Sequence, residues 1–223
     1  GVSLSSKIGK ACYIPIGHKS NKCIEKDLVL KKLKPLLEDP SIKKIGQNIK
    51  FDFIVFFKHG INMTSMEDTM LMSYVLDAGK NRHNMDTLSE IHLNHKTISF
   101  KDLVGTGKKE INFSEVDVEK AKDYAAEDAD ITFRLYKKFQ KSLKDEKMIN
   151  IYEIFEKPLL KILAFMEIEG VKIDNKFLKS LSTKFEKKIV KIQNEVFKIS
   201  KKKFNIASPK QLGEILYLSL IHI

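Results

Sequence analysis

The stretch that decides the fold of the first half of the chain is Gly46-Gln47-Asn48-Ile49-Lys50-Phe51-Asp52. It follows a short apolar run at 42–45, and a strand that ends at a glycine before a helix is typical of mixed α/β domains. On that helix Asn48 and Asp52 would lie one turn apart on one face. Taken by itself, the pattern is equally that of an Asn N-cap followed by a solvated Asp.

The residues around this stretch extend the α/β pattern. Residues 1–5 and 11–16 alternate as two paired strands do, and the run at 42–45 predicts a third strand. Apolar residues recur at helical spacing in several segments, of which the helix after Asn48 should end at Gly60 and the next should begin at Asp68. The expected helices are 28–37, 48–59, 68–76, 83–92 and 117–143. These elements predict a sheet covered by helices within residues 1–147.

A second group of polar residues lies on the long helix expected at 117–143. It reads Asp123-Tyr124-Ala125-Ala126-Glu127-Asp128-Ala129-Asp130 and places Tyr124 and Asp128 on one face. A solvated acidic helix start is the simple explanation, yet the rest of the chain is basic. Carboxylates held together on such a background suit a hard cation such as Mg²⁺ or Mn²⁺.

The composition gives weaker guidance about partners. The 223 residues carry a formal net charge of +11, which fits a protein that binds a polyanion. Almost all basic residues are lysines, so the excess of charge by itself leaves nucleic-acid binding open. Cys12 and Cys23 are too few for a zinc knuckle or a disulfide framework, and no apolar run is long enough for a membrane span. We therefore expect a cytoplasmic protein without a membrane partner.

Beyond Lys147 the sequence is helical. Helical spacing covers 151–169 and 175–203, and Ser208-Pro209-Lys210-Gln211 predicts a further helix start with a capping box. The final residues 218–223 look like the translated end of a sequencing adaptor, and we expect them to be an artefact. The expected division is thus 1–147, 148–217 and 218–223.

These motifs together resemble a known family. The Asn-x-x-x-Asp segment at Asn48 and Asp52 and the Tyr-x-x-x-Asp segment at Tyr124 and Asp128 are similar to the second and third motifs of DEDDy-type 3′→5′ exonucleases. The segments between them resemble the proofreading domain of bacterial family A DNA polymerases, and those after Lys147 resemble the entry to the thumb of the polymerase domain. The segments that carry the similarity are 68–71, 83–88, 95–100, 169–174 and 204–212.

The resemblance implies a fold and a division of the chain. The fold would be α/β, a ribonuclease H-like exonuclease domain at 1–147 that lacks its first strand, followed by the α-helical start of the thumb at 148–217. The first exonuclease motif, Asp-x-Glu, would precede Gly1, so the chain alone should bind metal poorly and cleave little or no DNA.

The resemblance also implies residue roles. Asp128 would be a direct ligand of one catalytic metal ion and Asp52 would help to hold the second, so two Mg²⁺ or Mn²⁺ ions would act. Tyr124 would orient the attacking water. Gln47 and Asn48 would position the DNA strand or a carboxylate, and a further residue would contact the frayed 3′ end, namely Phe100.

The partners implied are a single-stranded DNA 3′ end and a primer-template duplex, and the protein would be a monomer in DNA replication and repair. Two other functions compete. A ribonuclease D-like RNA 3′ exonuclease shares both motifs, although the segments after Lys147 are typical of polymerases. A catalytically inactive exonuclease fold that only holds DNA is the other, because the first motif is absent from the sequence.

Overall fold

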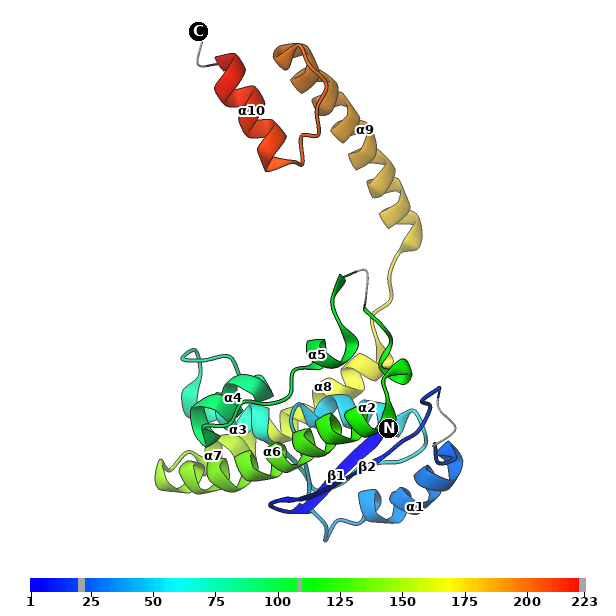
Figure 1. Cartoon of the computed structure of the whole chain (residues 1–223), viewed down its shortest axis with the longest axis vertical. Helices are drawn as coiled ribbons and strands as arrows, with labels where there is room; N and C mark the ends of the chain where they lie inside the picture. The colour runs from blue at the N-terminus through cyan, green and yellow to red at the C-terminus, as the bar shows by residue number, and fades with distance from the viewer. Residues whose placement is uncertain (20–22, 108–109, 221–223) are drawn as a thin grey trace. The chain divides into compact units, whose positions relative to one another are not determined.

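The computed structural model describes residues 1–19, 23–107 and 110–220, with side chains up to Tyr217. They form two compact units, Gly1–Gly170 and a second that begins at Val171 (Figure 1). Of the segment 218–223 predicted to be an artefact, residues 218–220 continue the last helix and residues 221–223 lie outside the described part of the chain.

The strands of the first unit form two separate pairs. Strands β1 (Val2–Lys7) and β2 (Lys10–Ile14) make an antiparallel hairpin, as the sequence predicts. Strand β3 (Lys44–Gly46) pairs in parallel with β4 (Met66–Asp68). Strand β4 was not predicted, because its three residues are all buried and a fully buried strand shows no alternation.

The helices confirm the predicted α/β class, and all five helices expected within 1–147 are present. The long helix α6 packs against the hairpin and against α3 and α4 (Figure 1). Its N-cap is Asp117, whose side chain accepts the N–H of Glu119 at 3.0 Å. The helices of this part are α1 (Lys26–Glu38), α2 (Ile49–Phe57), α3 (Thr69–Asp77), α4 (Met85–Leu93), α5 (Phe100–Val104), a 3₁₀ turn (Phe113–Glu115) and α6 (Val118–Asp145).

The first unit extends beyond the boundary that we expected at Lys147. It continues through α7 (Ile149–Ile151), a π-helical turn (Tyr152–Glu156) and α8 (Lys157–Glu169). These helices stay with the first unit because their apolar side chains enter its cores, where Tyr152, Leu160 and Ala164 are buried. The contacts therefore divide the chain at Gly170.

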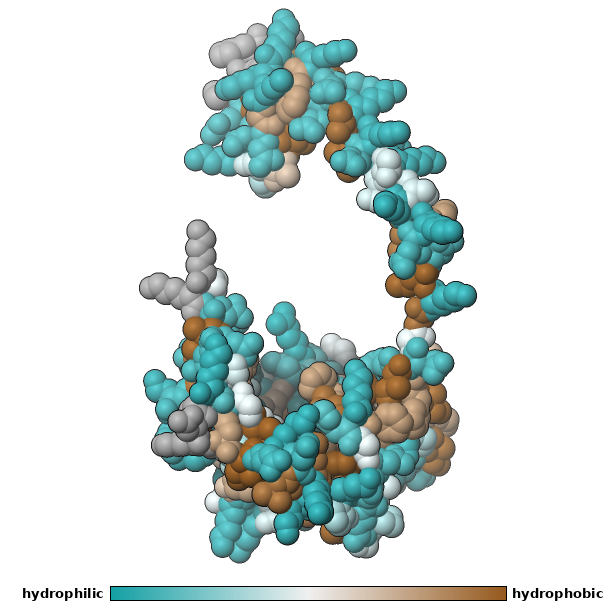
Figure 2. Space-filling model, turned by 90° about the vertical axis from the view of Figure 1, so that its right-hand side faces the viewer, coloured by the Kyte–Doolittle hydropathy of each residue, from teal (hydrophilic) through white to brown (hydrophobic). Residues whose placement is uncertain are grey.

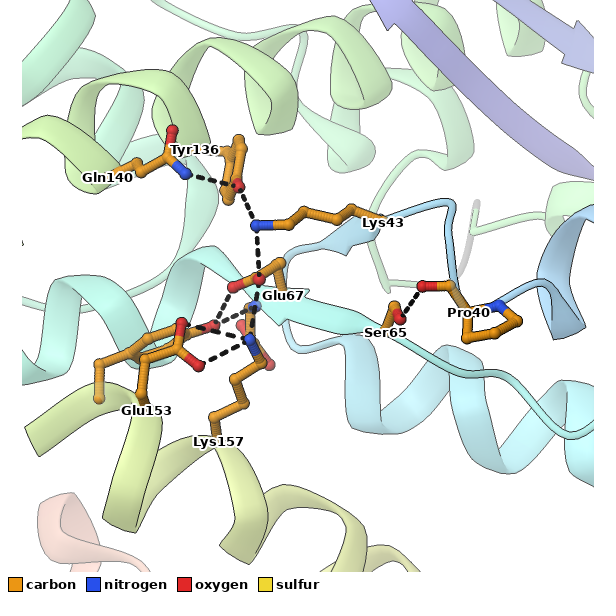
Figure 3. A network of polar contacts seen from close by, with 10 residues as sticks. Pro40, Lys43, Ser65, Glu67, Tyr136, Gln140, Glu153 and Lys157 are labelled. Carbon is orange, nitrogen blue, oxygen red and sulfur yellow. Dashed lines mark hydrogen bonds and ion pairs between the residues drawn. The ribbon is translucent and has the colours of Figure 1, made fainter. Parts of the chain in front are cut away.

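A buried polar network also fastens these helices to β4. Glu67 is 3% exposed, and its carboxylate accepts hydrogen bonds from the Tyr152 hydroxyl at 3.0 Å and from Lys157 Nζ at 2.9 Å. Lys43 Nζ approaches the same carboxylate at 3.4 Å from the start of β3 (Figure 3). Because the buried charge meets two cations and a hydroxyl, its desolvation is largely offset.

The second unit consists of helices α9 (Asn175–Ser200) and α10 (Pro209–Leu220). None of the residues of α9 is buried, and its surface mixes lysines with apolar side chains, as the teal and brown areas of Figure 2 illustrate. The predicted capping box is half formed: the Ser208 hydroxyl accepts the N–H of Gln211 at 3.4 Å, whereas the Gln211 side chain accepts the N–H of Asn205 at 2.8 Å and not that of Ser208. Within the described residues, no helix has both the length and the hydropathy of a membrane span.

Candidate active site

The turn from β3 to α2 differs in one detail from the prediction. Helix α2 begins at Ile49, and Asn48 precedes it in the left-handed conformation with φ 57°, so Asn48 is not part of the helix face that carries Asp52. The turn is tight, because a Cβ on Gly46 would lie 2.7 Å from the Cβ of Ile49. Glycine at this position therefore allows the strand to end directly against the helix.

Asp68 caps two helices at once. Its Oδ1 accepts the N–H groups of Asn48 at 3.0 Å and Met70 at 2.8 Å, and its Oδ2 accepts the N–H of Ile49 at 3.0 Å. The sequence predicted Asp68 as the N-cap of α3, which is confirmed. Its bond to α2 was missed, because the Asn48 side chain was considered for that cap and makes no capping bond.

Asp52 lies in the first turn of α2 and faces a large cavity. Partial desolvation by the surrounding protein atoms raises the pKa of its carboxyl to about 6, and the nearby charge of Asp68 adds to the shift. The residue itself remains accessible from the cavity. A carboxylate in this position is ready to exchange its proton for a cation.

Asp128 reaches the same cavity from α6. Burial raises its pKa to about 7, the Tyr124 hydroxyl acts in the opposite direction, and Glu127 and Asp86 raise it further. Among the side chains that the structure describes, Asp128 Oδ1 is the buried polar atom without a hydrogen-bond partner. Such an atom costs free energy unless a ligand satisfies it.

The cavity has a volume of about 1130 Å³ and lies between the two strand pairs. Strands β1 and β3 both line it, although β1 pairs only with β2 and β3 only with β4 among the described residues. Helices α1, α2 and α6 supply most of the other walls, and residues of β2 and Met85 of α4 complete them. The two acidic residues therefore face a space that two strands border without pairing across it.

Of the other predicted residues, Gln47 lines this cavity and Asn48, Tyr124 and Phe100 do not. The Gln47 side chain donates a hydrogen bond to the carbonyl of His83 at 2.7 Å and accepts one from the hydroxyl of Thr69. These two bonds fix the orientation of its amide group. The Tyr124 hydroxyl lies next to Asp128, and burial raises the pKa of Tyr124.

Phe100 belongs to a cluster of three aromatic rings at the start of α5. Its ring centroid lies 5.9 Å from that of Phe113, with the rings stacked, and 6.0 Å from that of Tyr124. Phe100 is 47% exposed, so one side of the cluster is open to a ligand. The sequence did not single out Phe113, which lies on a 3₁₀ turn that it did not predict.

Glu127 makes structural hydrogen bonds that the sequence pattern did not predict. Its Oε1 bonds to His95 Nε2 at 2.8 Å and its Oε2 accepts the N–H of Ile98 at 2.6 Å. It thereby ties the segment before Phe100 to α6. The sequence grouped Glu127 with Asp128 as a possible cation ligand, because adjacent residues cannot be separated by pattern when their partners are distant.

The donor atoms fit a divalent cation in part. Asp52 and Asp128 offer carboxylate oxygens, which Mg²⁺ and Mn²⁺ prefer, and the unpaired Asp128 Oδ1 is an acceptor that a cation would satisfy. Within the described ranges, no group of three or more His, Cys, Asp or Glu side chains is arranged to hold a metal ion. Two carboxylates and water would have to share the coordination with other ligands.

Comparison with solved structures supports the fold. The structure described as the POL domain of Pol1 from M. smegmatis, in complex with DNA primer-template and dNTP, superposes with a TM-score of 0.63 at 20% identity. The match covers 90% of this chain and 32% of that chain. Together with the match of residues 1–144 to the family model described as 3'-5' exonuclease, this likeness confirms the predicted ribonuclease H-like exonuclease fold followed by a helical segment.

Comparison with known sequences identifies the family. DNA polymerase I of Rhizobium leguminosarum is 41% identical over 220 residues, which are 93% of this chain and 22% of that protein. DNA polymerase I of Pseudomonas aeruginosa is 38% identical, over 97% of this chain and 24% of that protein. The chain thus spans about a quarter or less of these relatives. Residues 1–144 match the family model described as 3'-5' exonuclease. The chain belongs to this 3'-5' exonuclease family of the bacterial family A DNA polymerases.

Proposed function

We propose that this chain is part of a DNA polymerase whose proofreading domain removes nucleotides from the 3′ end of DNA by hydrolysis. The observation that carries the proposal is the shared cavity of Asp52 and Asp128, whose carboxylates both have raised pKa values. Perturbed acids in one cavity are typical of functional sites, and the family of the chain specifies the reaction.

Two divalent metal ions, Mg²⁺ or Mn²⁺, would be held with the help of these acids. Asp128 would be a direct ligand through its unpaired Oδ1, and Asp52 would hold the second ion, partly through water. When bound, such ions activate water and stabilise the leaving 3′ oxygen of a phosphodiester. Asp52 and Asp128 would contribute by staying ionised next to the metal ions. Without a cation, the ionised form of each acid is disfavoured by its surroundings in the cavity.

Other side chains would handle the substrate. The Tyr124 hydroxyl, next to Asp128, would orient the attacking water. Phe100 would stack on the last base of a frayed strand, since its ring is exposed and supported by Phe113. Gln47 is held by its own hydrogen bonds, so with Asn48 it would position a carboxylate or the strand and take no part in the chemistry.

The space between β1 and β3 supports a further part of the proposal. A strand that enters it would pair with both and would bring its side chains next to Asp52 and Asp128. We assign this place to the strand that carries the Asp-x-Glu motif of the family. That strand would supply the ligands that two carboxylates leave unfilled.

The remainder of the proposal concerns the full-length DNA polymerase of which we propose that this chain is a part, called the longer protein or longer polymerase below. Residues 148–217 would be the helical start of a polymerase thumb, with 148–170 attached to the exonuclease unit. The M. smegmatis structure contains a DNA primer-template, and we propose the same partner here. The protein would act as a monomer in the bacterial cytoplasm during replication and repair.

The test is a digestion of 5′-labelled single strands by the longer protein in Mg²⁺. We expect a ladder of products shortened from the 3′ end for DNA, with RNA of the same sequence cleaved much more slowly. Equal or faster cleavage of RNA would favour the RNA exonuclease. No cleavage of either strand, with normal DNA binding, would favour an inactive DNA-holding module.

A further inference from the structure

The first turn of α2 depends on a residue outside it. Asn48 occupies the N-cap position, but its side chain makes no capping bond and its φ of 57° is unusual for a residue with a side chain. The free N–H groups of a helix start need acceptors. Those of Asn48 and Ile49 find them in the two oxygens of the Asp68 carboxylate.

The Asp68 carboxylate accepts hydrogen bonds from three main-chain N–H groups in all. It is 1% exposed, and it also accepts the N–H of Met70 at the start of α3. Its own main-chain N–H donates to the hydroxyl of Tyr152 at 3.0 Å. Tyr152 in turn donates to Glu67, the centre of the network in Figure 3. Asp68 is thus a fixed point between β4, the two helix starts and the π-helical turn.

Asp52 lies in the turn of α2 that Asp68 holds. We propose that Asp68 is a positioning residue for the exonuclease reaction: it fixes the start of α2 and thereby keeps the Asp52 carboxylate in the cavity. The inference rests on the proposed function. An ordinary N-cap serves one helix, whereas this carboxylate serves two and spends both its oxygens on them.

The conservative variant Asp68→Asn separates this role from simple folding. Its amide keeps the shape but has one acceptor oxygen and a donor group, so the two N–H groups of α2 cannot both be satisfied. Asp145→Asn is the matched control on an exposed residue of α6. Leu143→Ala is a second control, because it weakens a core that lies away from α2.

The first measurement is amide hydrogen exchange by NMR on the 223-residue chain. In Asp68→Asn we expect the amides of Asn48 and Ile49 to exchange about tenfold faster or more, through local opening of the first turn. Asp145→Asn should leave both rates unchanged, and Leu143→Ala should affect them less. Equal rates in Asp68→Asn and the original chain would overturn the inference.

The second measurement is the rate of 3′ nucleotide release by the longer polymerase. Asp68→Asn should lower kcat about 10- to 100-fold, as expected for a displaced reacting group, and leave nucleotide incorporation intact. Combined with Asp52→Asn it should cause no additional loss, because it acts through that residue. An additive loss would overturn the inference.

The two failures can be told apart. An active polymerase whose Asp68→Asn variant is equally active refutes the role of Asp68 alone. A polymerase with no exonuclease activity refutes the proposed function, and the positioning role with it, whatever the exchange rates.

Discussion

Asp52 and Asp128 line the same cavity from two helices, α2 and α6, that are far apart in the sequence. Burial raises the pKa of both, to about 6 and about 7. An acid whose surroundings raise its pKa is costly to ionise, and a cation bound beside it would offset that cost. This relationship links the stability of the unit to its proposed chemistry, and it gives the first prediction.

Asp128→Asn should stabilise the metal-free chain at high pH. Because its folded-state pKa lies above the ordinary 3.8, the folded chain binds more protons than the unfolded chain between about pH 4 and pH 7. The free energy of unfolding therefore falls as the pH rises through this range. At pH 8 we expect Asp128→Asn to raise it by about 1–2 kcal/mol, after allowance for solvent screening.

Urea unfolding in EDTA at pH 4 and pH 8 measures this effect, with Asp145→Asn as the exposed control. The gain from Asp128→Asn should shrink at pH 4, where the carboxyl is protonated in the folded chain and already partly protonated in the unfolded chain. A variant that is less stable than the original chain at pH 8 would contradict the prediction, because the ionised Asp128 would then stabilise the folded chain.

Tyr124→Phe should affect turnover and not folding. The change removes the hydroxyl next to Asp128 and keeps the ring against Phe100. We expect 3′ nucleotide release by the longer protein to fall about 10- to 100-fold, as for loss of a group that orients a proton transfer. Tyr217→Phe, on the exposed side of α10, is the matched control. Equal rates in both variants would remove Tyr124 from the reaction.

Phe100→Ala should weaken the hold on the 3′ end. Stacking of one base on an aromatic ring contributes about 1–3 kcal/mol, so KM for single-stranded DNA should rise roughly 5- to 100-fold with a smaller change in kcat. The control is Phe155→Ala, which removes an exposed ring from the π-helical turn. If kcat falls and KM does not, Phe100 supports Tyr124 and does not bind a base.

Glu67→Gln should destabilise the first unit. The change leaves Lys157 and Lys43 facing a neutral amide in a buried place. Loss of one charge from a buried pair costs about 1–3 kcal/mol or more, and urea unfolding of the 223-residue chain measures it. Glu90→Gln, on an exposed position of α4, should change nothing. A neutral result for Glu67→Gln would mean that the network does not fasten α8 to β4.

The sequence predicted most helices of the first unit because amphipathic spacing and helix caps are local properties. The spacing of α6 and its N-cap at Asp117 are examples, as is the cap of α3 at Asp68. The two motifs also singled out Asp52 and Asp128, which line one cavity, while the roles of both residues stay predictions. A local sequence pattern was sufficient to predict an element wherever the residues of that element alone determine its structure.

The remaining features depend on contacts between distant residues. Strand β4 exists because it pairs with β3, and three buried residues show no period. Three further features join elements that are far apart in the chain. They are the hydrogen bonds of Asp68 to the start of α2, those of Glu127 to the segment before Phe100, and the attachment of α8 to β4 through Glu67. No pattern in a single segment encodes such partners.

The central claim is that Asp52 and Asp128 together perform 3′→5′ hydrolysis, and the most direct test is the rate of 3′ nucleotide release by the longer polymerase carrying Asp128→Asn. Loss of a metal-holding carboxylate should lower this rate roughly 10³-fold or more in saturating Mg²⁺, with nucleotide incorporation unchanged as the internal control. Asp52→Asn should behave alike, and Asp145→Asn should not. An Asp128→Asn variant that still shortens DNA at the original rate would contradict the account.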